Sequence, residues 1–212
     1  MLYFSLQISK EKMNDIQKTT TNKRFAMLAN LGEVVFHTKD LGNLWNIRNK
    51  NTLYVTLSRY KSLGIIYRIC NGLYSIKNPK DIDPYLISVK FLRKYSYISC
   101  ESILFNSGII NQPSREITLV SSVSKRFIIL GQKFRSRKLK KIFLFNDCGI
   151  YLKNNIRFAT TERAIADILY FNPKKYFDAF DSNLINWQKV NEISKQVGYN
   201  IKIPKIYDDT SK

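Results

Sequence analysis

The chain has 212 residues and a formal net charge of +19, from 35 Lys and Arg against 16 Asp and Glu. This excess favours a polyanionic partner, with nucleic acid ahead of an anionic membrane surface. Three widely spaced cysteines and a single histidine, His37, provide neither a disulfide framework nor a metal site, and they indicate a cytoplasmic protein without a cofactor. No segment reaches the roughly 18 apolar residues of a membrane span.

Residues 1–18 have no clear pattern and are interpreted as an N-terminal extension. Residues 19–80 predict a winged helix-turn-helix domain. Its first helix is expected over residues 19–31, with Phe25, Leu28 and Leu31 packing on the helices that follow. The second helix is expected from a Thr38 cap to Trp45, after a short extended link at residues 33–37.

A third helix is expected between residues 49 and 63, ending at Gly64, before two apolar runs joined by Asn71-Gly72. Asn-Gly between apolar runs predicts a β-hairpin, which would be the wing. In the third helix, Leu53, Leu57 and Tyr60 share one face, which is expected to be buried.

The opposite face of this helix predicts a surface that reads DNA bases, because it offers short polar groups, one arginine and no acid. Its candidate residues are Asn51, Thr52, Val55, Ser58, Arg59 and Ser62. The candidates for phosphate contact, in the helix and the wing, are Lys50, Lys61, Arg68, Asn71 and Gly72. A solvated polar face is the structural alternative.

Two prolines and two aspartates between Asn78 and Pro84 mark a domain boundary, with Asp83 and Pro84 opening the next helix. Residues 81–205 predict a second, mixed α+β domain with helices around an antiparallel sheet, and residues 206–212 a polar tail. Ser99 is a candidate helix cap, and Asn154-Asn155 predicts a hairpin turn. Thr160 or Thr161 is expected to cap a helix through Phe171.

The second domain has a basic segment of its own, with six basic residues among the nine from Lys133 to Lys141. Such a surface fits phosphate or RNA, whereas a charged strand edge that prevents aggregation is an equally good interpretation. The residues of this C-terminal basic surface are Lys125, Arg126, Lys133, Arg135, Arg137, Lys138, Lys140 and Lys141.

Several segments recur in a recognisable order. The first domain contains HTKDL at residues 37–41, TLSRY at residues 56–60 and NGLY at residues 71–74. The second contains YISCES at residues 97–102, NSGII at residues 106–110 and ATTERA at residues 159–164. Over about residues 19–200, this series resembles the AbiEi family of antitoxins from bacterial type IV toxin–antitoxin and abortive-infection systems. The sequence departs from that family at Thr161, where proline is usual, and at Asn106, where histidine is frequent.

The resemblance implies two activities. The first domain would bind inverted repeats in double-stranded DNA upstream of its operon and repress transcription. The second would counteract a cognate nucleotidyltransferase toxin without forming a stable complex with it. This second activity rests on the resemblance alone.

Two other functional classes compete with this interpretation. A nucleic-acid-processing enzyme, or an RNA-binding protein anchored by the winged domain, is the alternative. A metal nuclease needs converging carboxylates, and the available acids are Glu101, Glu116, Asp147, Glu162 and Asp167. Glu162 and Asp167 are five residues apart, off a shared helix face, and are expected at a helix start and in contact with solvent. No catalytic residue is therefore expected. A basic protein–protein or membrane-surface adaptor is the remaining class, and the lack of a strongly amphipathic basic helix in the sequence counts against it.

Overall fold

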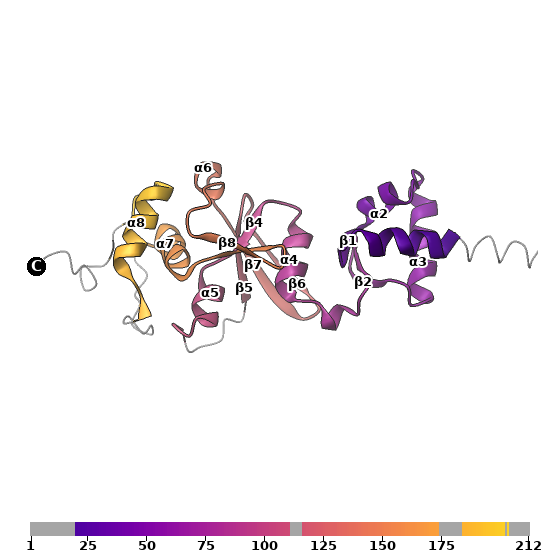
Figure 1. Ribbon diagram of the computed structural model, residues 1–212, viewed down its shortest axis with the longest axis horizontal. Helices are drawn as coiled ribbons and strands as arrows, with labels where there is room; N and C mark the ends of the chain where they lie inside the picture. The colour runs from indigo at the N-terminus through magenta and orange to yellow at the C-terminus, as the bar shows by residue number, and fades with distance from the viewer. Residues whose placement is uncertain (1–19, 111–115, 174–183, 202, 204–212) are drawn as a thin grey trace, which may run out of the picture. The chain divides into compact units, whose positions relative to one another are not determined.

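The computed structural model describes residues 20–110, 116–173, 184–201 and 203 (Figure 1). The chain divides between Ile82 and Asp83 into two compact units, called here the N-terminal and C-terminal units. The sequence placed this boundary after residue 80. The expected extension at residues 1–18 and the polar tail at residues 206–212 lie outside the described residues. Within the described residues, no helix is long and apolar enough to cross a membrane.

The N-terminal unit combines helices with a small antiparallel sheet. A helix over residues 20–30 precedes the other elements. These are β1 (Val35–His37), α2 (Thr38–Leu44), α3 (Lys50–Ser62), β2 (Tyr67–Cys70), β3 (Leu73–Ser75) and the short 3-10 helix η1 (Pro79–Asp81). The strand order is β1-β3-β2. The segment expected as an extended link is thus partly a strand, because β1 pairs with β3.

Local side-chain contacts set the helix ends in this unit. The Asn49 side chain accepts the Thr52 N–H at 3.1 Å and starts α3. The prediction that Thr38 caps α2 is wrong: His37 is the N-cap, and its own N–H donates to the Asp40 carboxylate at 3.3 Å. An acid in the first turn of a helix also suits the helix dipole.

The core of the N-terminal unit joins the first helix to α2 and α3. Leu28, Leu41 and Leu57 are completely buried, and the rings of Trp45 and Tyr60 meet edge to face at 5.4 Å. The expectation that Phe25 and Leu31 join Leu28 in this core is wrong, because their side chains are 43% and 51% exposed. One face of a short helix suffices to cover α2 and α3, and Leu28 lies at its centre with Met27 packed beside it.

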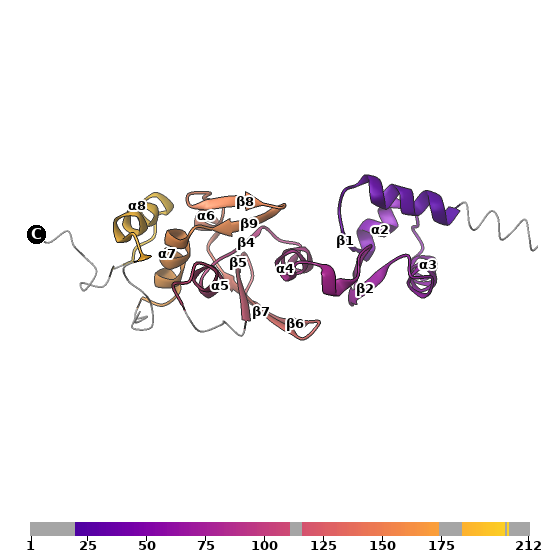
Figure 2. The ribbon, with the colours of Figure 1, turned by 60° about the horizontal axis from the view of Figure 1, so that its bottom comes forward.

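The C-terminal unit packs helices on both faces of a six-stranded sheet of order β6-β7-β5-β4-β9-β8. Helix α4 covers one face, whereas α5 and α7 cover the other and α8 packs on α7 (Figure 2). The helices are α4 (Pro84–Leu92), α5 (Glu101–Asn106), α6 (Lys141–Leu144), α7 (Thr161–Phe171) and α8 (Trp187–Val197). The strands are β4 (Ser96–Ile98), β5 (Glu116–Ser121), β6 (Lys125–Ile129), β7 (Gln132–Lys138), β8 (Ile150–Lys153) and β9 (Ile156–Ala159).

This sheet is mixed, so the prediction of an antiparallel sheet is wrong in part. Strand β5 pairs in parallel with β7, and β4 with β9. The hairpins β6–β7 and β8–β9 are antiparallel, and the second turns at Asn154-Asn155 as predicted. Turn residues predict a hairpin from the local sequence. Which strand the hairpin then pairs with, and in which direction, depends on packing between segments far apart in the chain.

Helix α7 contains a buried ion pair that ties the helical layer together. Arg163 Nε donates to Asp167 Oδ1 at 3.1 Å, and both side chains are fully buried. The guanidinium also donates to the backbone carbonyls of Phe143, Asn146 and Cys148. Burial alone would lower the pKa of Arg163, but the Asp167 carboxylate together with Tyr97 and Tyr199 outweighs burial and raises that pKa. The guanidinium therefore stays charged inside the protein.

Asp167 is the acceptor at the centre of this network. It accepts the hydroxyl of Ser99 at 2.7 Å and that of Tyr199 at 2.6 Å. The assignment of Asp167 to solvent contact is therefore wrong, because the carboxylate is completely buried. The prediction that Ser99 caps α5 is also wrong: Cys100 occupies the cap position, with a positive φ of 56°.

Candidate nucleic-acid interface

Helix α3 presents two different faces. Leu53, Leu57 and Tyr60 are buried, as expected, and Thr56 is buried beside them. The six predicted base-contacting residues are all exposed, namely Asn51, Thr52, Val55, Ser58, Arg59 and Ser62. The structure therefore brings them together on one outer surface of one helix. No acidic side chain lies in the helix itself.

Two of these side chains are engaged within the helix. The Arg59 guanidinium carbon lies 5.6 Å from the centre of the Tyr60 ring, and the Ser62 hydroxyl donates to the Ser58 carbonyl at 3.1 Å. Burial alone would raise the pKa of Tyr60, but the hydrogen bond from Thr21, the hydrogen bond and charge of Arg24 and the hydrogen bond from Arg59 together outweigh burial and lower that pKa. Arg59 would have to swing away from this ring to reach a base.

The hairpin β2–β3 follows α3 and carries the predicted wing residues. Arg68 folds back on the turn, because its Nε donates to the Cys70 carbonyl and its Nη2 to Asn71 Oδ1, both at 3.4 Å. Gly72 has a φ of +79°, which favours glycine at the turn. Lys50 and Lys61, at opposite ends of α3, are both exposed.

The sequence prediction omits one exposed residue of α3. The Tyr54 side chain is 54% exposed, next to Val55, which is 68% exposed. Helical spacing would have found it, because residue 54 lies three positions after Asn51 and four before Ser58. A tyrosine on this face adds an aromatic surface and a hydroxyl group to the polar set.

The structure divides the predicted C-terminal basic surface between two faces of the β6–β7 hairpin. Successive side chains of a strand point to opposite faces. Arg126 of β6 and Arg135 of β7 are direct partners in the ladder, so they share one face. Lys125 and Lys138 belong to the opposite face, where Lys125 Nζ lies 4.6 Å from the centre of the Phe91 ring of α4.

The remaining basic residues differ in availability. Lys133 is exposed and lies two positions before Arg135, on the same face. Arg137 continues that face but is engaged, because its Nη2 lies 2.7 Å from Glu101 and its guanidinium covers the Phe171 ring. Lys140 and Lys141 are exposed at the start of α6, outside the sheet.

The acids considered for catalysis are dispersed. Glu101 pairs with Arg137, Asp147 accepts the Tyr95 hydroxyl at 2.7 Å, and Glu162 lies 3.8 Å from Lys189. Asp167 is buried in its own network, and Glu116 lies on β5. The described residues contain no group of three or more His, Cys, Asp or Glu side chains able to hold a metal ion.

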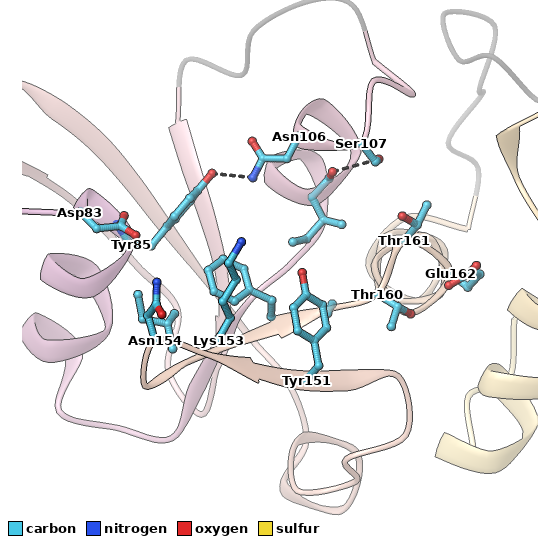
Figure 3. Close-up of a pocket in the computed structure, with 14 residues that line it drawn as sticks. Asp83, Tyr85, Asn106, Ser107, Tyr151, Lys153, Asn154, Thr160, Thr161 and Glu162 are labelled. Atoms are coloured by element: carbon cyan, nitrogen blue, oxygen red, sulfur yellow. Dashed lines mark hydrogen bonds between the residues drawn. The ribbon is translucent and has the colours of Figure 1, made fainter.

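A cavity of about 560 Å³ opens in the C-terminal unit between α4, α5, the β8–β9 hairpin and the start of α7 (Figure 3). Asn106 lines this cavity and donates to the Tyr85 hydroxyl at 2.8 Å. It is one of the two positions at which the sequence differs from the AbiEi pattern. The Lys153 amine and the Tyr151 hydroxyl also line the cavity. The size is within the roughly 300–1,000 Å³ of small-molecule sites.

No family model matches the sequence, and no curated protein matches it. A similar solved structure is the crystal structure of the RV2827C protein from Mycobacterium tuberculosis, with a TM-score of 0.52 and 11% sequence identity. The match covers 84% of this chain and 71% of that chain. At this identity the similarity shows a shared fold, so the mixed α and β architecture of this chain occurs in a second protein.

Proposed function

We propose that the N-terminal unit is a winged helix-turn-helix and that α3 binds in the major groove of DNA. The order of elements supports this: a helix, β1, α2, α3 and then the β2–β3 hairpin. The observation that carries the proposal is the outer face of α3, where the six base-contacting candidates are exposed together.

The chemistry of that face matches base recognition. Arginine binds guanine and asparagine binds adenine through paired hydrogen bonds, while short hydroxyls contact either. Residues near the start of a recognition helix reach the base edges first, which places Asn51 and Thr52 in favourable positions. Arg59 lies two turns later, and exchanging its Tyr60 ring contact for a guanine is a small rearrangement of one side chain.

The basic side chains around α3 would contact the phosphate backbone of the DNA. Lys50, Lys61 and Arg68 are exposed, and phosphate contacts of this kind position a protein on DNA without reading its sequence. Together with the net charge of +19, they predict binding that weakens steeply as salt is raised.

The AbiEi resemblance extends the proposal. The DNA would be inverted repeats upstream of the protein's own operon, so that binding represses it. The C-terminal unit would neutralise a cognate nucleotidyltransferase toxin without a stable complex. The protein would then be an autoregulating antitoxin and not an enzyme.

Fluorescence anisotropy tests DNA recognition, with the protein's own upstream duplex compared with a random duplex across a salt series. A preference of about a thousandfold or more is expected of a sequence-specific repressor. Arg59→Ala should cost about 1–3 kcal/mol at one base position, whereas the matched Lys61→Ala should weaken binding to all sequences alike. Equal losses on both duplexes for Arg59→Ala would refute base reading by Arg59.

Antitoxin activity is tested in cells that express a nucleotidyltransferase toxin encoded beside this gene. The full chain should restore growth, and a chain with Asn51→Ala and Arg59→Ala should restore it equally well while losing repression. If the intact chain gives no protection, the antitoxin assignment fails and the repressor assignment is unaffected.

A further inference from the structure

The outer face of the β6–β7 hairpin concentrates positive charge in the C-terminal unit. Arg126 and Lys133 are exposed, Arg135 is half-buried, and all three lie on the face opposite α4. Ile128, directly across from Lys133, is 65% exposed on that face. These four residues are called the hairpin face below. The hairpin is an edge of the sheet, since β6 has a neighbour on one side only.

In the part of the chain that the structure describes, no carboxylate forms an ion pair with Arg126, Lys133 or Arg135. Glu116 is the ladder partner of Lys133 on β5 and the nearest acid in register. Glu101 is engaged by Arg137 further along the face.

The pairing of two arginines across the hairpin lowers the stability of the sheet. Arg126 and Arg135 are directly opposite each other in an antiparallel pair, and like charges in that position destabilise a sheet. Protecting the strand edge against aggregation requires charge, but it does not require two arginines side by side on one face. A bound polyanion would offset this repulsion, because both arginines would then attract the same negative charge.

We propose that the hairpin face binds the phosphate backbone of duplex DNA, as a second contact surface separate from α3. Neighbouring strands are roughly 4.8 Å apart and alternate residues roughly 6.8 Å apart, so the three long side chains span a flat patch within reach of adjacent phosphates. Arginine and lysine are the side chains that make such contacts. The contact reads no sequence and adds affinity to the α3 interaction through the covalent link between the units.

This inference rests on the proposed function only in assuming the same class of partner, and random-sequence duplex therefore serves as the probe. The test variant of the full chain is Arg126→Gln with Arg135→Gln. The matched control is Lys125→Gln with Lys138→Gln, which removes one charge from each of the same two strands on the opposite face. Binding is measured by anisotropy across a salt series, with a duplex RNA of the same sequence as a second probe.

The test variant should lower the magnitude of the slope of log K against log salt on DNA by about 2, at about 0.9 per phosphate contact, and the control should leave it unchanged. The Tm of the test variant should stay the same or rise, because the like-charged pair is gone. Equal slopes for both variants would overturn the proposal, since net charge alone would then govern binding. A loss confined to RNA would overturn the DNA assignment. Variants of α3 distinguish the two proposals. If they lose the preference for the operator while the hairpin-face variant still changes the salt slope on random duplex, the hairpin face acts independently of the function proposed for α3.

Discussion

Replacing Asp167 with asparagine should destabilise the C-terminal unit by about 3–5 kcal/mol, the usual cost of removing one partner of a buried ion pair. The structure supports a value in this range because both Arg163 and Asp167 are fully buried, so the guanidinium would be left without its counter-charge. The hydroxyls of Ser99 and Tyr199 would also lose a charged acceptor. The free energy of unfolding of natural domains is only about 5–15 kcal/mol, so this loss would be a large fraction of the total.

Urea unfolding measures the change, and amide hydrogen exchange reports on each unit separately. The matched control is Glu162→Gln in the same helix, whose partner Lys189 lies 3.8 Å away with 53% of its side chain exposed. Exposed pairs contribute about 0–1 kcal/mol. A loss of less than about 1 kcal/mol for Asp167→Asn, or one equal to the control, would refute the reasoning.

Two further predictions concern the same unit. Gly149→Ala should cost about 2–4 kcal/mol in chemical unfolding, because its φ is +71° and a Cβ would lie 2.8 Å from Arg163 Cβ; the control Gly131→Ala, at φ +81° with open space around it, should cost about 1 kcal/mol. Stability should also fall at alkaline pH. Burial raises the pKa of Tyr97 and Tyr199 above the ordinary value, and burial with the Asp147 hydrogen bond raises the pKa of Tyr95 to about 12. The unfolded chain releases the protons of Tyr97 and Tyr199 from about pH 10 while the fold retains them. Stability is therefore full below pH 10, and these two groups together lower it by up to about 3 kcal/mol per pH unit above that. Thermal melts between pH 8 and 11 test this, and Tyr199→Phe should flatten the profile; a flat wild-type profile would contradict the argument.

The sequence by itself determined the features that depend on a few neighbouring residues. The Asp83 cap and Pro84 start of α4 were readable, and so was a threonine cap of α7, which the structure assigns to Thr160. Hairpins at Asn71-Gly72 and Asn154-Asn155 were readable for the same reason. Caps and turns are encoded by backbone preferences and hydrogen bonds that form within one turn of the chain.

The division of α3 into two faces was equally readable, because helical periodicity alone places Leu53 and Leu57 opposite Ser58 and Ser62. The candidate base-contacting surface therefore follows from the order of residues in one helix. Its one omission, Tyr54, shows that a polar face can also expose an aromatic ring.

Only the tertiary structure decided which distant segments meet. The parallel pairing of β5 with β7 and the burial of Asp167 against Ser99 depend on docking between segments far apart in sequence. The basic segment was visible as composition, but strand alternation and the register of β6 on β7 placed Arg126 beside Arg135 and sent Lys138 to the other face. Register and docking are set by the sum of many weak packing contacts, which no local pattern of residues records.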